Sequence, residues 1–489
     1  MRKMKNKRFI TYRKALVFGL IITLTLGCER DFTDDVKVAT FGTEGDIFTD
    51  SPIGMGEDFY FPYGDSNFEA ASFDGTEVFE GNTSIEVNVP NADNPNGAYA
   101  GAILRIDGAG RDLSGFDALT FYAKASQGVT LDAIGFGEDF GENKYQATVT
   151  DISLGTGWAK YIIPIPDPSK LIQERGMLRY ATGTQNTGGF GYTFWIDEIR
   201  FEKLGTLAQP RPRILNGSTI TENVFLGSTI QITGLTYTAN LPSGNNLTVA
   251  AAPSYYNFES SDTTVATVSE LGVITVLGEG TTTVTATMGN EEAEGTLILT
   301  SVGAFPSAPI PTRDAANVVS LFSDAYSNVP VRHYNGFFLP FQTTEGGAGS
   351  DPNNVDLQVP LTDGSFDNII NYTSLNFVSF GMYETVSLVD VSAMTHIHID
   401  INVRESIESS DFIRLSLESG TGVGAITSGD FVLNSSTLSN VDENGWTSVD
   451  IPLSSFFGFS DPANLGQLFF ISDATISNIW VDNVYFYNE

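Results

Sequence analysis

Cysteine, histidine and tryptophan are scarce in this chain of 489 residues. The single cysteine excludes any disulfide within the chain, so each domain must be stabilised by its own hydrophobic core. Only three histidines are present, and they supply few strong ligands for a transition metal. His396 and His398 lie two positions apart and would share one face of a strand. We therefore expect them on a polar face, opposite the core residues Ile397, Ile399, Ile401 and Val403.

Basic residues are also few. The chain has 25 lysines and arginines against 59 aspartates and glutamates, for a net charge of -34. Seven of the basic residues lie in the first fourteen positions, so without this leader the net charge is about -41. Such a surface repels phosphate backbones, and we expect no nucleic-acid partner.

Long helical patterns are absent after the leader. Gly, Thr, Ser, Val and aromatic residues are plentiful, and they favour strands and turns. The length suggests about three domains. The composition therefore predicts an all-β chain of several domains.

An internal repeat divides the chain. Residues 195–201 read Trp-Ile-Asp-Glu-Ile-Arg-Phe, and residues 480–486 read Trp-Val-Asp-Asn-Val-Tyr-Phe. Two earlier pairs occur in the same order, 112–123 with 390–401 and 158–164 with 446–452. The repeat predicts two related β-domains that flank something different. Strand alternation places Trp195, Asp197, Ile199 and Phe201 on one face and Ile196, Glu198 and Arg200 on the other.

The first 27 residues have a basic start and a short apolar stretch, as an export signal does. Leu24 to Cys28 resembles the lipobox of bacterial lipoproteins, and the resemblance implies acylation of Cys28 and a lipid anchor in the outer membrane. The acidic residues that follow resemble the surface-export signal of Bacteroidota lipoproteins. A plain secretory signal or an uncleaved anchor is the alternative. We expect residues 28–57 to form a flexible tether.

The two related domains are expected at residues 58–205 and 312–489. Short strand-like runs separated by turn residues are typical of antiparallel sandwiches. Phe68-Glu69, Glu80-Gly81 and the closing Trp195 strand resemble a carbohydrate-binding jelly roll of the galactose-binding-like superfamily. Residues 314–326 and 394–400 resemble the carbohydrate-binding-type domain of Bacteroidota glycan-utilisation lipoproteins and glycosidases.

Residues 212–302 have a different character, with Thr and Val in strict alternation. Residues 260–268, 272–274 and 278–286 resemble a bacterial immunoglobulin-like domain of group 2, which implies a spacer. Residues 209–213 and 305–311 are rich in proline, and we expect stiff linkers there.

Sugar binding needs flat aromatic faces together with polar partners for hydroxyl groups. The four tryptophans lie in the matched strands, so we assign them to the domain cores. Aromatic residues in loops and at strand borders are the candidate ligand-binding residues. They are Tyr60, Phe61, Tyr63, Tyr99 and Tyr145 in the first domain and Tyr334, Phe337 and Phe338 in the third.

Calcium is the metal that the resemblance to jelly-roll modules implies, in a structural role. The implied ligands are Glu69, Glu80 and Asp197 in the first domain, with Asp324 and Asp482 in the third. Ordinary surface acids are the alternative.

No catalytic residue is assigned. The acids at 138–142 lie in a Gly-rich turn, and no nucleophile elbow, phosphate loop or dinucleotide fingerprint occurs. The resemblances described above imply a non-catalytic surface protein that binds polysaccharide, with β-glucan among the candidates, beside an outer-membrane importer. A glycoside hydrolase or lyase with unrecognised acids and a structural adhesin are the alternatives.

Overall fold

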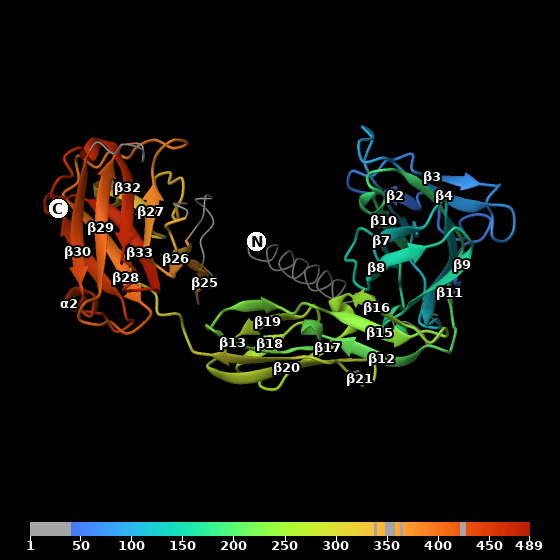
Figure 1. Ribbon diagram of the computed structural model, residues 1–489. Coiled ribbons are helices and arrows are strands. Elements are labelled where there is room, and N and C mark those ends of the chain that lie inside the picture. The colour runs from blue at the N-terminus through green and yellow to red at the C-terminus, as the bar shows by residue number, and fades with distance from the viewer. Residues whose placement is uncertain (1–40, 337–339, 348–356, 362–364, 421–426) are drawn as a thin grey trace, which may run out of the picture.

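A computed structural model describes residues 41–336, 340–347, 357–361, 365–420 and 427–489. These residues form three β-sandwiches, and Figure 1 shows the first and third at opposite ends of the middle one. The signal sequence, Cys28, Phe337 and Phe338 lie outside the described residues. Within the described ranges, no helix is long and apolar enough to cross a membrane.

The first sandwich has one sheet in the order β3-β4-β11-β6-β9, with β1 paired to β11. Its inward residues, such as Val87, Phe121 and Phe194, are fully buried and pack against the second sheet. The strands are β1 (Asp46–Phe48), β3 (Ala71–Asp74), β4 (Ser84–Val89), β6 (Ala118–Ala125), β9 (Ala159–Pro164) and β11 (Tyr192–Glu202).

The second sheet of this sandwich continues into the middle domain. Its order is β2-β5-β10-β7-β8 in the first sandwich and then β16-β15-β12 in the next. The crossing is made where Ala250 and Ala251 pair with Thr148 and Ala147. The strands are β2 (Tyr60–Pro62), β5 (Ala100–Arg105), β7 (Val129–Phe136), β8 (Ala147–Leu154), β10 (Gly176–Thr182), β12 (Ala208–Arg213), β15 (Thr236–Asn240) and β16 (Asn246–Ala251).

The predicted linker at 209–213 is wrong, because these residues form strand β12, which pairs with β15. β12 lies at the end of its sheet, where a proline removes no hydrogen bond that a neighbouring strand needs.

The rest of the middle domain consists of two small sheets, β13-β22-β20-β17 and β14-β19-β18, with β21 paired to β20. The strands are β13 (Thr219–Val224), β14 (Thr229–Gln231), β17 (Asn257–Ser260), β18 (Ala266–Val268), β19 (Val273–Val276), β20 (Gly280–Met288), β21 (Glu291–Glu292) and β22 (Thr296–Ser301).

The third sandwich repeats the strand order of the first. One sheet runs β24-β26-β33-β28-β31, with β23 paired to β33 and β25 to β26, and the other runs β27-β32-β29-β30. The matched segments of the sequence therefore occupy matched strands, and the prediction of an all-β chain with an immunoglobulin-like sandwich between two related ones is confirmed. The strands are β23 (Val318–Phe322), β24 (Glu345–Gly346), β25 (Leu357–Pro360), β26 (Phe366–Thr373), β27 (Phe377–Gly381), β28 (His396–Val403), β29 (Phe412–Ser419), β30 (Ser428–Asn434), β31 (Thr447–Pro452), β32 (Leu465–Ile471) and β33 (Ile479–Tyr487).

Both closing strands contain a β-bulge at the same place. Glu198 and Asn483 have φ angles of 49° and 50°, and the registers of β11 with β6 and of β33 with β28 shift there. The extra residue reverses the alternation beyond it. Ile196 and Ile199 therefore both face the core, and the predicted division of this strand into two strictly alternating faces is wrong.

The predicted tether of 28–57 is also wrong in its last part. Ile47 and Phe48 are fully buried in the first sandwich, and strand β1 pairs with β11. Arg111 holds this segment by donating to the carbonyl oxygens of Glu44 and Asp46, at 3.1 and 2.6 Å.

The assignment of the tryptophans to cores is confirmed for Trp446 and Trp480, which belong to a small buried cluster, and is wrong for Trp158 and Trp195. Trp446 and Trp480 are buried beneath the Pro-rich segment, where Trp446 Nε1 donates to the carbonyl oxygen of Pro306 at 2.6 Å. Trp158 and Trp195 are half-buried on the outer face of the first sandwich. The Pro-rich segment after residue 302 therefore packs against the third sandwich.

Candidate functional site

The second sheet of the first sandwich has one face in the core and one face outward. In β5, Ala100, Ala102 and Leu104 belong to the core, so the residues between them face outward. The register places Phe61, Ile103, Arg179, Gly135 and Thr148 in one row across five strands. We call this outward surface the open face.

At one side of the open face, aromatic rings enclose an arginine. The guanidinium of Arg105 lies 4.3 Å from the centre of the Phe61 ring and 5.8 Å from that of Phe140. The two rings meet edge to face at 5.7 Å. Arg105 also donates to the carbonyl oxygen of Asp139 at 2.9 Å. Phe140 is 50% exposed, so apolar ring surface remains accessible to solvent.

A second arginine crosses the middle of the open face. Nε of Arg179 lies 2.7 Å from a carboxylate oxygen of Glu138. Its terminal nitrogens donate to Thr148 Oγ1 and to the Tyr63 hydroxyl, both at 3.2 Å. Because each end of the guanidinium has a partner, the side chain is fixed before any ligand binds.

Two tyrosines lie against the backbone of Gly101. A Cβ added there would lie 2.7 Å from the Tyr99 ring and 3.3 Å from the Tyr63 ring, so any larger residue would displace them. The Tyr99 hydroxyl donates to the carbonyl oxygen of Tyr63 at 2.5 Å. Beside Tyr99 lies a depression of about 500 Å³, with Asp132, Ala181, Thr184 and Gln185 in its wall.

This arrangement suits a sugar ring. Aromatic rings contact the apolar face of a pyranose, while a fixed guanidinium and a carboxylate can meet its hydroxyl groups. The open face presents Phe61, Tyr63, Tyr99, Arg105, Glu138, Phe140 and Arg179.

Three of the predicted aromatic residues, Phe61, Tyr63 and Tyr99, come together on the open face. Tyr60 does not, because it faces inward and its hydroxyl lies 3.1 Å from that of buried Tyr180. Burial raises the pKa of Tyr60. Sequence reasoning missed Arg105, Glu138, Phe140 and Arg179, although the alternation in β5 and β10 could have identified the two arginines.

Tyr334 is a core residue, so its prediction is wrong. It is 3% exposed, its ring packs edge to face against Phe322 and Phe380, and its hydroxyl donates to the carbonyl oxygen of Leu321. Tyr145 lies away from the open face, at the junction with the middle domain. Its ring centre is 5.5 Å from that of Tyr255.

The third sandwich has a corresponding outward face that the sequence did not indicate. Ser379, Phe469, Ser416 and Asp430 form one row across its second sheet. Arg414 Nε lies 3.9 Å from Asp430 in this sheet. In the adjacent row, Gln467 donates to Glu418 at 3.2 Å. Among the described residues, Phe469 is the one ring in this row.

The predicted calcium ligands of the first sandwich are only partly close together. Asp197 Oδ2 accepts hydrogen bonds from the backbone N–H groups of Phe79 and Glu80, at 2.9 and 3.3 Å. Glu69 precedes β3 whereas Glu80 follows it, so these two residues lie at opposite ends of that strand. Among the described residues, these three carboxylates do not form a group placed to hold a metal ion, so calcium in the first sandwich stays a prediction.

In the third sandwich, Asp324 and Asp482 lie near a further acid, Asp367. Burial and the charge of Asp367 raise the pKa of Asp482 well above its usual value. Asp367 Oδ2 is buried and makes no well-formed hydrogen bond within the described residues. Both oxygens of Asp324 already accept from Asn368, at 2.7 Å.

A cation would relieve the repulsion between buried Asp367 and Asp482 and the nearby, exposed Asp324. The described part of the chain nevertheless contains no group of three or more acidic, histidine or cysteine side chains placed to hold a metal ion. The fit to calcium is therefore incomplete without side-chain movement.

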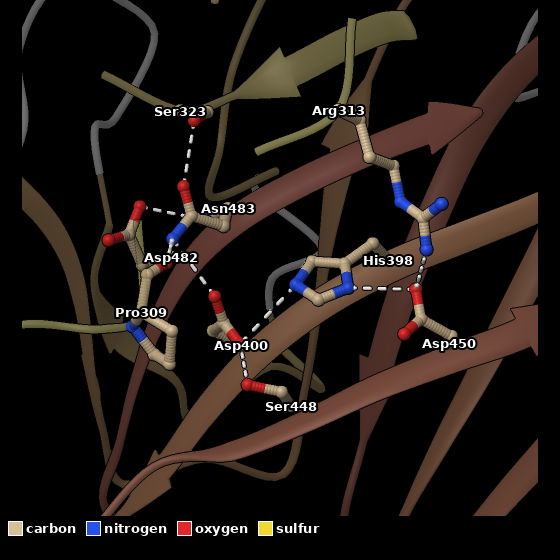
Figure 2. A network of polar contacts seen from close by, with 9 residues as sticks. All are labelled: Pro309, Arg313, Ser323, His398, Asp400, Ser448, Asp450, Asp482 and Asn483. Atoms are coloured by element: carbon tan, nitrogen blue, oxygen red, sulfur yellow. Dashed lines mark hydrogen bonds and ion pairs between the residues drawn. The ribbon is translucent and has the colours of Figure 1, made fainter. Parts of the chain in front are cut away.

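A polar network covers the outer face of the third sandwich (Figure 2). His398 Nδ1 lies 3.0 Å from Asp450 Oδ1, and its Nε2 lies 3.4 Å from Asp400 Oδ1. Burial opposes the charge on the imidazole, but its contacts with the two carboxylates raise the pKa of His398 to about 9.

A pKa of about 9 keeps His398 protonated at neutral pH, so the imidazole cannot accept a proton. We call the contact of this charged imidazole with Asp400 and Asp450 the clamp. The expectation of a polar face opposite Ile397, Ile399 and Ile401 is confirmed.

The network also reaches the segment that precedes the third sandwich. Arg313 lies 3.4 Å from Asp450. The Asn483 side chain donates to Asp400 at 2.9 Å and to the carbonyl oxygen of Pro309 at 3.2 Å (Figure 2). The bulge residue of β33 is therefore bound to the Pro-rich segment.

Comparison with known proteins identifies the middle domain. Residues 243–297 match the family model of the bacterial Ig-like domain (group 2), which confirms the resemblance found in the sequence. The match covers a small part of the chain and does not assign the rest of it. No curated protein matches the sequence.

Several solved carbohydrate-binding modules resemble parts of the chain. The family 30 module of the Clostridium thermocellum cellulase Cel9D-Cel44B is 19% identical and covers 33% of this chain and 98% of its own, with a TM-score of 0.25. The family 11 module of the same organism, solved with a β-1,3-1,4-mixed-linked tetrasaccharide, is 19% identical over 33% and 98%, with a TM-score of 0.21. The CBM22 tandem of Paenibacillus barcinonensis Xyn10C is 10% identical over 92% and 99%, also with a TM-score of 0.21. At these TM-scores the likeness carries no information about what this chain binds.

Proposed function

We propose that this chain is a non-catalytic, cell-surface polysaccharide-binding lipoprotein that captures glycan for uptake by a polysaccharide-utilisation system. The observation that supports this proposal is the open face of the first sandwich. There, exposed aromatic surface lies beside an arginine whose guanidinium is already fixed by Glu138, Tyr63 and Thr148. A pre-organised surface of this kind loses little side-chain freedom on binding.

The anchor and the location are part of the same proposal. The lipobox-like sequence that ends at Cys28 supports acylation, and the acidic run directly after it, which resembles a surface-export signal, supports exposure outside the cell. Metabolic labelling with palmitate should mark the wild-type protein and leave Cys28→Ala unlabelled. Labelling of the variant would refute the anchor without touching the binding proposal.

The binding proposal is tested by affinity electrophoresis in gels that contain laminarin, mixed-linkage β-glucan, xylan or alginate. We expect at least one polymer to retard the protein, with β-glucan as the first candidate. Reducing ends are measured in parallel. Release of sugar would support a hydrolase, products with an unsaturated end would support a lyase, and no retardation by any polymer would leave the adhesin.

A further inference from the structure

A second pocket lies at the junction between the first sandwich and the middle domain, away from the open face. Its volume is about 410 Å³, within the range of roughly 300–1,000 Å³ that is common for small-molecule sites. It is lined by Lys144, Tyr145, Lys170, Ser254, Phe258 and Glu270, among others. The sheet that crosses the junction through β8 and β16 holds its two sides together.

Two lysines face this pocket in a strongly acidic chain. Lys170 Nζ lies 3.0 Å from the side-chain oxygen of Asn257, which leaves its other donors available. Lys144 Nζ lies 4.0 Å from Glu270, a loose pair at the rim in which the side chain of Glu270 is 89% exposed. Glu270 is the one carboxylate among the lining residues, so the positive charge is only weakly compensated.

The wall and floor supply the remaining parts of a binding site. Tyr256 and Phe258 stack with ring centres 5.7 Å apart. The Tyr256 hydroxyl donates to the carbonyl oxygen of Thr236 at 2.8 Å, so its position is fixed. Ser254 is 6% exposed, and within the described residues its Oγ has no hydrogen-bond partner. A buried hydroxyl without a partner is rare, and a ligand oxygen could satisfy it.

We propose that this junction pocket binds an anionic pyranose, a sugar residue that carries a carboxylate or a sulfate. The two ammonium groups would meet the anion, the half-buried Phe258 ring, supported from behind by buried Tyr256, would meet the apolar face of the sugar, and Ser254 Oγ would bond to a ring hydroxyl. The site is separate from the open face and does not depend on it.

Isothermal titration of the full chain with oligogalacturonate, with sulfated carrageenan oligosaccharides and with neutral laminari-oligosaccharides tests the proposal. We expect at least one anionic series to bind, and Lys144→Gln and Lys170→Gln each to weaken it by about tenfold. Affinity should also fall as sodium chloride is raised, because the contacts are ionic. The series that binds identifies the anion as carboxylate or sulfate.

Lys203→Gln is the matched control, since it removes the same charge from the same sandwich outside the pocket. It should bind like the wild type. Ser254→Ala should fold normally and bind more weakly. The proposal is overturned if neither anionic series binds the wild type, or if Lys203→Gln weakens binding as much as the pocket variants do.

Discussion

His398 Nδ1 lies 3.0 Å from Oδ1 of Asp450, and the pair joins two strands of the third sandwich to the segment that enters it. The contact with His398 lowers the pKa of Asp450 to about 2. Arg313 adds a second positive charge from the entering segment, 3.4 Å from the same carboxylate oxygen. The outer face of this sandwich is therefore fixed by charges as well as by packing.

This clamp should make the third sandwich sensitive to alkaline pH. The pKa of His398 is raised from 6.5 to about 9, so its stabilisation is fully present below pH 6.5 and is lost as the pH rises through 9. The pKa of Asp450 is lowered from 3.8 to about 2, so its stabilisation is lost as the pH falls through 2. We expect His398→Gln to cost about 1–2 kcal/mol at pH 6, after allowance for solvent around Asp450.

Thermal unfolding of the wild type and the variant at pH 6 and pH 10 measures this effect, and the difference between them should shrink at pH 10. His396→Gln is the control, because the His396 ring stacks on Tyr487 and its Nδ1 bonds to the Thr395 hydroxyl rather than to a carboxylate. A difference that is the same at both pH values would show that the clamp does not titrate as expected.

Binding of neutral glycan should depend on the open face. We expect Phe61→Ala to weaken binding by about tenfold, because it removes a stacking surface and the ring beneath the Arg105 guanidinium, each worth about 0.5–1.5 kcal/mol. Arg179→Met should have a similar effect, since it also removes the ion pair of Glu138 and leaves that carboxylate only the amide of Gln146. Titration with the polymer that retards the wild type measures both.

Phe366→Ala is the matched aromatic control for this experiment. Phe366 is 52% exposed on β26 of the third sandwich. This strand belongs to one sheet of the sandwich, whereas the outward row that contains Phe469 belongs to the other. Loss of binding in this variant, with Phe61→Ala unaffected, would move the glycan site to the third sandwich.

Calcium should stabilise the third sandwich if its acids bind it. At a concentration one hundred times the dissociation constant the gain is about 2.7 kcal/mol, seen as a rise in melting temperature. Asp482→Asn should abolish this gain. Without calcium the same variant should melt no lower than the wild type, because an amide cannot ionise beside Asp367 in this buried place.

Glu443→Gln, which changes an exposed acid of the same sandwich, should keep the full response to calcium. Equal melting curves of the wild type with calcium and with a chelator would show that this sandwich binds no calcium.

The junction between the first two domains should depend on Tyr255. Its side chain is fully buried, and its hydroxyl donates to the carbonyl oxygen of Tyr145 at 2.7 Å. Tyr255→Ala should cost roughly 3–5 kcal/mol, as for other large aromatic truncations. Tyr255→Phe should cost about 1 kcal/mol, the value of one hydrogen bond. Urea unfolding measures both, and equal costs would show that the ring contributes little.

The repeat and the middle domain were predictable because each depends on patterns within single strands. The matched strands contain similar residues in the same order, and the Thr-Val alternation of the middle domain can be recognised without knowing which strands pair. The bulges at Glu198 and Asn483 were not predictable, because one residue with a positive φ changes the facing of all that follow. Strict alternation therefore placed Ile196 and Ile199 on opposite faces of the first closing strand, although both face the core.

The open face was predictable only in part. The sequence identified Phe61, Tyr63 and Tyr99 as candidate ligand-binding residues because they are aromatic and lie in loops or near strand borders. Arg179 could not be placed beside Phe61, because the two residues are brought together by the pairing of β2, β5 and β10, which are distant in the sequence. Tyr60 shows the same limit, since a one-residue difference in register decides between core and surface.

The sheet shared by the first two domains has a mechanical consequence. A hydrogen-bonded ladder cannot swing as a free hinge, so these two domains should turn as one body and bending should concentrate near residue 302. The first and third sandwiches could then bind one long polymer together only where the shape of that polymer lets both reach it at once.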